Sequence, residues 1–463
     1  MKIKLKWLLF FSLLVIFAAI GAFMPRTTFD VNDPKIIGAD VAWMLCATAL
    51  VLLMTPGLSF FYGGMVRTKN VVSTILQSFI AMGVISITWV VVGFSLAFGD
   101  SISLGGVGTG IIGNPFTFFM FRNVGSATNA GLSPTIPLAL FALFQMKFAI
   151  ITPALITGSF AERVKFSGYL VFMVLWSIFI YAPLAHWTWH PNGFLRNMGV
   201  LDFAGGTVVH MAAGFAALAG ALFLGQRQVK KQYRPANIPF VLLGTGLLWF
   251  GWFGFNAGSA LSANGQAVDA FLNTNTAAAA AMLAWIFFDT FRGRKASALG
   301  ACIGAVIGLV AVTPASGFVS VGSAMVIGVV AAVVCNIAVH WKNKTGVDDA
   351  LDVFPGHGIG GVVGMILTGV FAKDVGLIYG NPKIFFMHLL AIVIVGVFTF
   401  GGSYIIYKVT SLIIPMRVTP ESEQMGLDLS QHDESYLSLE TDENEIEGYN
   451  TIPNGTSPLN QKK

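Results

Sequence analysis

The sequence has few charged side chains and few cysteines. Only 11% of its 463 residues are Asp, Glu, Lys or Arg, whereas a soluble domain carries about 25%. A surface in water cannot be built from so few charges, which excludes a soluble enzyme and a nucleic-acid-binding protein. Cys46, Cys302 and Cys335 lie in apolar runs at spacings that suit neither a zinc site nor a disulfide framework. We expect them to be small core residues.

Hydrophobic residues, in contrast, make up 55% of the chain and form long runs. A bilayer core about 30 Å thick is spanned by about 20 apolar residues in a helix. The runs therefore predict an all-α polytopic membrane protein with eleven transmembrane helices. They lie near residues 36–62, 70–98, 134–160, 167–186, 203–225, 237–258, 273–291, 297–316, 320–340, 354–372 and 384–410.

A further apolar stretch, residues 7–24, follows three lysines within the first six residues. A basic start before a short apolar stretch is typical of a signal peptide, and residues 19–22 (AIGA) offer a tolerable cleavage site. The alternative is a retained extra helix. We expect three parts: a signal peptide or extra N-terminal helix (1–30), a membrane domain (31–413) and a C-terminal tail (414–463).

Basic residues are concentrated in alternate loops. Five alternate connections carry 13 Lys or Arg together, while the intervening loops carry only Arg122, Arg196, Lys373 and Lys383. The positive-inside rule places the basic loops in the cytoplasm. Eleven spans then leave the N-terminus outside, if the leader is cleaved, and the tail in the cytoplasm. The tail holds 10 of the 22 acidic residues, and its composition from about residue 437 predicts disorder.

Two histidines lie inside apolar runs, where an ionisable group costs several kcal/mol unless it faces the bundle interior. His210 is in the fifth run and His357 in the tenth, each beside glycines and after an aspartate, Asp202 or Asp352. This match predicts an inverted 5+5 repeat plus one helix, as in many transport folds. Ordinary packing is the alternative for each histidine. We interpret Asp202 as a helix cap, a group with proton chemistry, or both, and Asp352 as a capping or hinge charge.

Aromatic residues form a second group of candidates. They are Phe141, Phe144, Phe148, Phe253, Phe255, Trp187 and Trp189. The first three are spaced three and four residues apart and so share a helix face. Core packing and an interfacial aromatic belt are the default interpretations. The alternative is a collar that attracts a small cation through cation–π contacts, with Ser259 as a hydrogen-bond acceptor.

These stretches resemble the ammonium transporter family (Amt/Mep/Rh) over roughly residues 36–436. The stretch that resembles the family signature is residues 202–210 (DFAGGTVVH), continued by AAG at 212–214 and GQR at 225–227. Supporting matches are PGLSFFYGG at 56–64, AER at 161–163, GFNAGS at 254–259, VTP at 312–314 and GHG at 356–358.

The resemblance implies a homotrimer of eleven-span subunits in the cell inner (plasma) membrane, each with a narrow apolar pore. It implies a transporter rather than an enzyme, with no cofactor and no metal. By position, ammonium recruitment falls to Trp189, Phe148, Ser259, Asp202 and Thr313, a gate to Phe148, Phe255 and Phe144, and a pore proton relay to His210 and His357. Trp189 and Ser259 favour the ion-recruiting Amt branch over the gas-conducting Rh branch.

The mechanism expected from this resemblance is loss of a proton at the pore entrance. Ammonium can lose a proton and potassium cannot, so a dry apolar pore passes ammonia and stops potassium. The imidazoles of His210 and His357 would hydrogen-bond ammonia or relay its proton, because histidine titrates near neutral pH. We expect electrogenic uptake with separate proton transfer.

Two features depart from the family pattern. Lys147 adjoins Phe148, but it points about 100° away from the shared face of the phenylalanines, so we expect it to snorkel or to pair at a subunit contact. Residues 417–434 resemble a cytoplasmic segment that meets PII-type signal proteins. There Asp433 stands where the pattern has glycine, which makes such a partner less certain than transport.

Two further classes of function remain open. The first is an electron carrier with His210 and His357 as axial haem ligands. The second is an ammonium sensor that signals through a PII-type partner, since the tail of about 50 residues has no room for a signalling domain.

Overall fold

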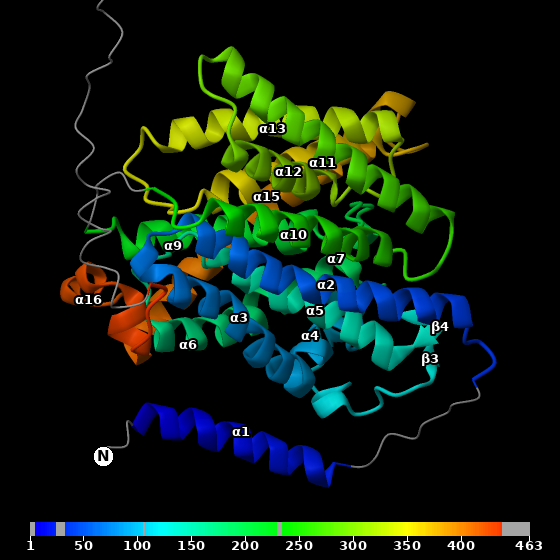
Figure 1. Ribbon diagram of the computed structural model, residues 1–463. Helices are drawn as coiled ribbons and strands as arrows, with labels where there is room; N and C mark the ends of the chain where they lie inside the picture. Colours follow the sequence, from blue (N-terminus) through cyan, green and yellow to red (C-terminus); the bar gives the residue numbers. More distant parts are fainter. Residues whose placement is uncertain (1–4, 25–32, 105–106, 229–233, 438–463) are drawn as a thin grey trace, which may run out of the picture.

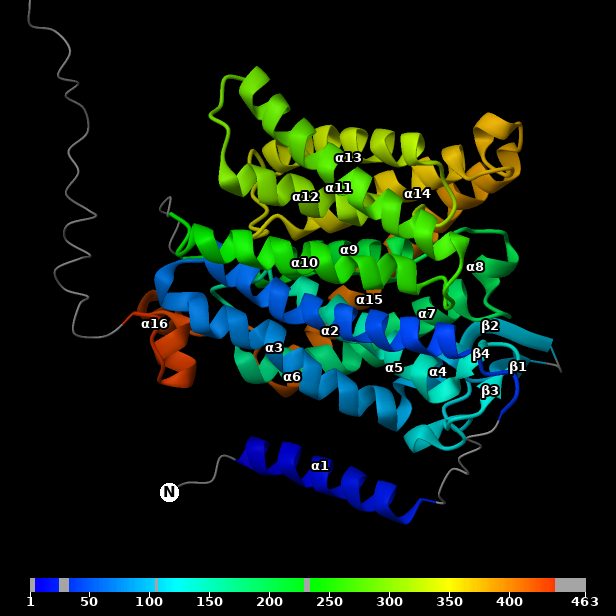
Figure 2. The same cartoon turned by 45° about the vertical axis from the view of Figure 1, so that its right-hand side comes forward.

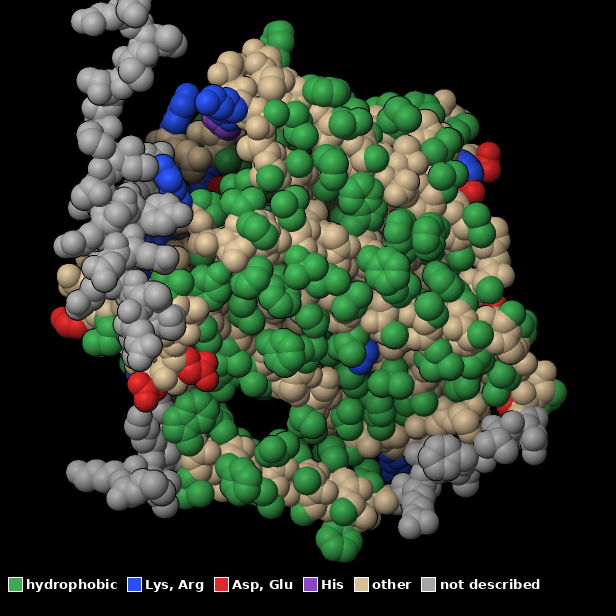
Figure 3. All heavy atoms as spheres, viewed as in Figure 1, with side chains coloured by type: hydrophobic (Ala, Val, Ile, Leu, Met, Phe, Trp, Pro, Cys, Tyr) green, Lys and Arg blue, Asp and Glu red, His purple; other side chains and the backbone are tan. Residues whose placement is uncertain are grey.

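The protein is a bundle of helices that run side by side, seen in a computed structural model (Figures 1 and 2). The structure describes residues 5–24, 33–104, 107–228 and 234–437. Within these residues ten helical segments are long and apolar enough to cross a membrane. In Figure 3 hydrophobic side chains cover most of the face in view, and most charged side chains lie toward its two ends. The multi-pass membrane fold predicted from the sequence is therefore confirmed.

Six of the spans are single α-helices and four are interrupted or extended by short turns. The single helices are α2 (Gly38–Met65), α5 (Leu138–Ile156), α10 (Ile238–Gly258), α11 (Gly265–Phe291) and α13 (Val321–Lys342), with α15 (Pro382–Ile413) the longest. The composite spans are η1–α3–η2–α4 (Thr68–Asn70, Val71–Thr88, Trp89–Gly93, Phe94–Phe98), α6–η4–α7–α8 (Phe166–Trp176, Ser177–Tyr181, Ala182–Trp189, Phe194–Asn197), η5–α9 (Gly206–Met211, Ala212–Leu224) and η6–α14 (Phe354–Ile359, Gly360–Phe371). Six single and four composite segments make up the ten.

The eighth predicted run forms a shorter helix, α12 (Ala298–Val312), of 15 residues. At 1.5 Å per residue it is about 22 Å long, less than a bilayer core. Its end is dictated locally, because Pro314 has no backbone N–H to continue the helical hydrogen bonds. α12 packs against both α11 and α13. Ten of the eleven predicted runs thus reach full length in the described residues.

The N-terminal helix α1 (Leu5–Phe23) covers the stretch predicted to be a leader or an extra helix. It lies along one side of the bundle in both Figure 1 and Figure 2. Most of its side chains from Trp7 onward are exposed, and Phe23 reaches 89% exposure. The helix therefore contributes little to the core.

One end of the bundle carries two small antiparallel hairpins. They are β1–β2 (Ser101–Leu104, Val107–Gly113) and β3–β4 (Thr128–Asn129, Ser133–Pro137). A short turn, η3 (Phe119–Phe121), lies between them in the chain. The first hairpin packs on α4 and α7, and the second on α2 and α5. We call this the hairpin end, and the opposite end, where the C-terminal tail docks, the tail end.

The tail end is held by a buried network of ion pairs. Glu162, which is fully buried, accepts from the backbone N and the Nε of Arg67 and pairs with Arg227 at 3.0 Å. Arg227 also pairs with Asp348 at 2.8 Å. These charges come from four different loops, and a buried ion is tolerated only when it is paired and hydrogen-bonded. The network therefore fixes the loops relative to one another.

The first part of the tail folds onto this network as α16 (Pro420–Met425) and the π-helical turn η8 (Asp428–His432). Asp428 accepts from the backbone N–H groups of Val72 and Ser73, which caps the start of α3. Leu427 N donates to Asn70. The tail up to residue 437 is thus ordered, and the disorder predicted beyond residue 437 falls outside the described residues.

One prediction about the core was wrong. Cys302 and Cys335 are buried as expected, but Cys46 is exposed. It lies next to Leu45 on the outward face of α2, where Leu45 is 57% exposed. An apolar run cannot separate core from lipid-facing positions, since both are hydrophobic in a membrane protein.

Candidate functional site

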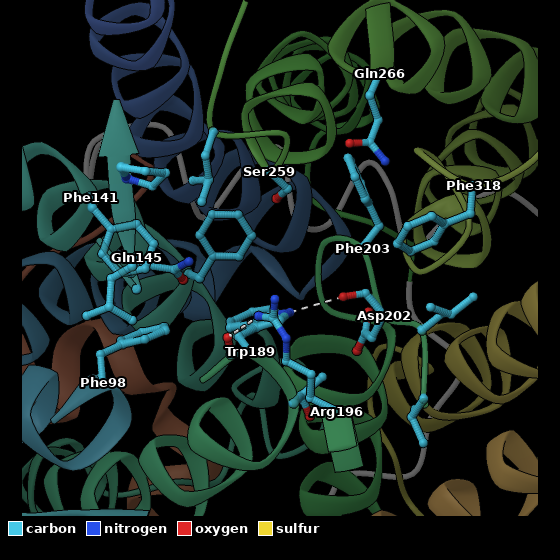
Figure 4. A pocket seen from close by; sticks show the side chains of 18 of the residues that line it. Phe98, Phe141, Gln145, Trp189, Arg196, Asp202, Phe203, Ser259, Gln266 and Phe318 are labelled. Carbon is cyan, nitrogen blue, oxygen red and sulfur yellow. Dashed lines mark hydrogen bonds between the residues drawn. The ribbon is translucent and has the colours of Figure 1, made fainter. Parts of the chain in front are cut away.

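A cavity of about 440 Å³ opens at the hairpin end (Figure 4). Six of the nineteen residues that line it are aromatic, among them Phe98, Phe141, Phe203 and Phe318. Trp189, Phe148 and Ser259, predicted to act together, all line it. The faces of these aromatic rings attract a small cation.

Two hydrogen bonds hold Trp189 at the cavity wall, one from its indole and one to its backbone carbonyl. Its Nε1 donates to the carbonyl of Asp202 at 3.1 Å, and its own carbonyl accepts from Arg196 at 2.8 Å (Figure 4). Ser259 Oγ donates to the carbonyl of Phe255 at 2.9 Å. Because the hydroxyl proton is committed, its lone pairs remain available to an incoming N–H donor.

Two stacked phenylalanines close the floor of the cavity. The rings of Phe148 and Phe255 are 4.2 Å apart with planes 30° from parallel. Phe144 meets Phe148 edge-on at 4.9 Å, and Trp189 meets it edge-on at 5.7 Å. All three phenylalanines are buried, so the predicted gate residues form one closed apolar layer.

Beneath this layer lie the two histidines, each in a π-helical turn. His210 is in η5 and His357 in η6. Their rings are 5.4 Å apart, 25° from parallel, and the two Nδ1 atoms are 3.4 Å apart. Phe255 lies 6.0 Å from the ring of His210. The two histidines therefore lie side by side, directly below the layer of phenylalanines.

Hydrogen-bond partners determine which nitrogens of the pair carry protons. Thr313 Oγ1 donates to the carbonyl of Leu309 and accepts from Trp252 Nε1 at 2.9 Å. It therefore accepts again at 3.3 Å from His210, whose Nε2 must carry the proton. His210 Nδ1 is then an acceptor and His357 Nδ1 the donor, which leaves His357 Nε2 unprotonated.

Thr313 was expected near the recruitment cavity, but it lies deeper, beside His210. It follows the C-terminal end of α12, at the VTP motif, and is fully buried. Trp252, which stacks on His210 at 5.4 Å, was not predicted. The sequence could have indicated this position, because Trp252 is three residues before Phe255 and so shares its face of α10.

Asp202 caps the segment that carries His210. Its two carboxylate oxygens accept from the backbone N–H groups of Gly205, Gly206 and Thr207 at 2.6–2.8 Å, and from the Thr207 hydroxyl. The carboxylate is 7% exposed. Four bonds occupy about all of the lone pairs of a carboxylate, which supports the interpretation of Asp202 as a cap.

The two histidine segments meet backbone to backbone. Gly214 in α9 packs so closely on the Gly358 amide of η6 that no side-chain carbon would fit between them. Gly205 adopts φ +123°, which favours glycine, just before η5 begins. Glycines thus set both the entry into η5 and the spacing of the histidine pair.

Some aromatic and charged candidates lie elsewhere. Phe253 stacks on Phe271 at 3.9 Å, away from the pore, and Trp187 packs on Phe194 and Phe398. Lys147 does not line the cavity, and no described carboxylate pairs with it. Its predicted role at a lipid or subunit surface stays a prediction.

The site does not suit a metal or haem. Within residues 5–24, 33–104, 107–228 and 234–437 no group of three or more His, Cys, Asp or Glu could hold a metal ion. A metal–imidazole bond is about 2 Å long, so an axial bis-imidazole ion needs about 4 Å between nitrogens. His210 and His357 are instead hydrogen-bonded directly to each other, which argues against the haem alternative.

Known proteins are similar to this chain in both sequence and fold. The model of the Ammonium Transporter Family matches residues 42–436. The ammonium transporter of Bacillus subtilis is 45% identical over 403 residues, which cover 85% of this chain and 97% of the relative. The crystal structure of Saccharomyces cerevisiae Mep2 aligns with a TM-score of 0.77 at 36% identity, covering 84% of this chain and 89% of that one.

A protein titled "Sensor Amt Protein" has a similar fold as well. It aligns with a TM-score of 0.78 at 30% identity, over 85% of this chain and 98% of its own. The chain is thus similar both to proteins named as transporters and to one named as a sensor, and the family to which it belongs is the same in either case. From its multi-pass membrane fold and these matches, the chain belongs to the ammonium transporter family.

Proposed function

We propose that this protein transports ammonium by recruiting the ion in the aromatic cavity and passing ammonia along the histidine pair. The observation that carries the proposal is the order of the three layers: the cavity with Trp189 and Ser259, the stacked Phe148–Phe255 pair, and the hydrogen-bonded histidines. Each layer suits one stage of the passage, namely capture, dehydration and proton handling.

Selectivity in this proposal follows from charge rather than size. The buried Phe layer and the buried histidines form a path of low dielectric, in which a bare cation costs far more than a neutral molecule. Ammonium enters such a path after losing a proton, while potassium has none to lose. The proton then crosses separately, so uptake is electrogenic.

The topology proposed from the sequence accompanies this function. We place the hairpin end outside and the tail end in the cytoplasm of the cell inner membrane, because the basic loops gather at the tail end. Counting α12, the domain of residues 31–413 has eleven spans, with residues 1–30 as a signal peptide or an extra N-terminal helix. The π-helical turns η5 and η6 around matching histidines support an inverted 5+5 repeat.

Assembly and regulation are proposed from family resemblance. We propose a homotrimer, and a PII-type protein as a possible partner at the tail end. The ordered segment up to residue 437 supports such docking, because Asp428 anchors it to the start of α3 and Arg417 to the end of α9.

The second candidate function is an ammonium sensor, favoured by the similarity to the sensor protein named above. The two functions differ in whether ammonium moves. Growth of a transporter-deleted host on low ammonium separates them, because a transporter restores growth and a sensor alone does not.

The direct test is current from protein reconstituted in vesicles after an ammonium jump. We expect an inward current with ammonium and none with an equal potassium jump, and its loss in His210→Ala and His357→Ala. His340→Ala, at the end of α13 away from the pore, is the matched control and should retain the current. Unchanged current and selectivity in both pore variants contradict the proposal.

A further inference from the structure

A buried histidine that does not line the recruitment cavity is bonded to the segment that forms one of its walls. His388 lies in α15 and is fully buried. Its Nε2 accepts from the backbone N–H of Leu201 at 3.0 Å, and its Nδ1 donates to the carbonyl of Met365, in α14, at 2.8 Å. The proposed transport steps do not use this histidine, although it joins the cavity wall to two helices.

The two partners of His388 allow one protonation state of its ring. A backbone N–H only donates and a carbonyl only accepts. Nε2 is therefore unprotonated and Nδ1 carries the proton, so the ring is neutral. The ring also has little room to turn, because α14 approaches it so closely that a side-chain carbon at Gly369 would lie 3.3 Å from its Cγ. His388 is thus an acceptor fixed toward Leu201.

The segment that His388 holds, residues 200–205, is neither helix nor strand. A backbone outside regular structure depends on individual hydrogen bonds for its position. The backbone N–H of Phe203 donates to the carbonyl of Pro314 at 3.1 Å. On the other side of Asp202, the N–H of Leu201 donates to the histidine. Loss of the histidine acceptor therefore removes one of the two backbone N–H anchors that flank Asp202.

This segment is part of the recruitment cavity. Residues 200–203 all line it, and the carbonyl of Asp202 accepts from the indole N–H of Trp189 at 3.1 Å (Figure 4). Because Leu201 and Asp202 are adjacent, the anchor at His388 is next in the chain to the bond that positions the indole. A shift of the anchored backbone would move the cavity wall and the indole together.

We propose that His388 is a positioning residue, which holds residues 200–203 in the geometry that receives ammonium. Without its acceptor nitrogen, the segment adopts that geometry for only a fraction of the time, and the apparent affinity for the ion falls in proportion to this fraction. Saturating ammonium selects the receiving geometry again, so the maximal current is retained. This role rests on the proposed function, because it concerns the ion that the cavity recruits.

A role of His388 in stability alone has a different outcome. The bond to Met365 links α15 to α14, so loss of the ring could weaken the bundle. A weaker bundle lowers the amount of folded protein and with it the maximal current. It leaves unchanged the ammonium concentration at half-maximal current, the KM. The response of the KM, compared with that of the maximal current, therefore separates positioning of the cavity wall from stabilisation of the fold.

The test compares two variants that keep different hydrogen bonds of His388. In His388→Gln the amide oxygen lies as many bonds from Cβ as Nε2 does, so it can still accept from Leu201. In His388→Asn the polar atoms end at the δ position, so a donor to Met365 remains but Leu201 is out of reach.

The ammonium current of full-length protein in vesicles is measured over a range of ammonium concentrations. We expect His388→Asn to raise the KM about two- to tenfold, the range that one intramolecular hydrogen bond contributes. Its maximal current should stay close to that of the wild type, and His388→Gln should keep the wild-type KM. His340→Asn, near the C-terminal end of α13, is the control and should change neither quantity.

Equal KM values in His388→Asn and His388→Gln overturn the role, and so does a fall in maximal current with an unchanged KM. If His388→Asn fails to fold, as judged by gel filtration, His388→Met takes its place, because it fills similar space without a strong acceptor and should raise the KM in the same way. A wild-type protein without ammonium current refutes the proposed function itself, and this role with it. Wild-type current together with a wild-type KM in His388→Asn refutes the role alone.

Discussion

We expect the carboxylate of Asp202 to stabilise the structure of the pore rather than to take part directly in proton transfer. Asp202 lies eight residues before His210, and its four hydrogen bonds hold the turn that begins η5. Asp202→Asn replaces one accepting oxygen by an NH2 group that faces donors, so two of the four bonds are lost. A hydrogen bond to a charged group contributes about 1.5–3 kcal/mol. We expect a loss of about 3 kcal/mol or more in the free energy of unfolding.

The assay is thermal unfolding of purified protein in detergent, run beside the ammonium current. Asp202→Asn should melt several degrees below the wild type and carry little current, because His210 shifts with its segment. Asp374→Asn, an exposed aspartate at the same end, should stay within about 0.5 kcal/mol of the wild type. If Asp202→Asn melts like the wild type yet carries no current, the capping argument fails and direct proton chemistry replaces it.

Three other perturbations have expected outcomes. Glu162→Gln leaves the buried Arg67 charge unbalanced and should cost about 3–5 kcal/mol in the free energy of unfolding. Burial opposes ionisation of Glu162, but the hydrogen bonds and charge of Arg67 lower its pKa overall. The ionised carboxylate therefore stabilises the fold fully above about pH 4.3, and this stabilisation is lost as the pH falls through the lowered pKa of Glu162. Melting curves across this pH range test the sign. Phe148→Ala or Phe255→Ala should cost about 3–5 kcal/mol and wet the gate, which a potassium-evoked current would reveal and its absence would contradict. Arg196→Gln removes a cation from the recruitment cavity and should raise the apparent ammonium affinity about two- to fivefold at low salt, whereas unchanged affinity would show that its charge is screened.

Much of the membrane fold could be predicted because lipid imposes a simple rule on the sequence. Apolar runs long enough to span a bilayer marked ten of the helices. The exception, α12, ends just before Pro314, which has no N–H to extend the helix. Side-chain spacing also placed Phe144 and Phe148 on one face. These features depend on local sequence alone.

The contacts around the histidines could not be predicted in the same way. The position of Thr313 beside His210 and the stacking of Trp252 arise from packing between helices distant in the sequence. It is Asp349, not Asp352, that caps the start of η6, because its carboxylate reaches Phe354 N, a matter of backbone geometry over a few residues. Similar limits explain the exposed Cys46, since lipid-facing and buried positions are equally apolar.

The contact between Gly214 and Gly358 has a consequence for engineering the pore. Since the two chains touch through their main-chain atoms, the gap between the imidazoles is set by rigid scaffolding rather than by adjustable side groups. Trimming residues along the lumen would therefore widen it little for bulkier amines. A redesign for such cargo would have to begin by pushing these two glycines apart.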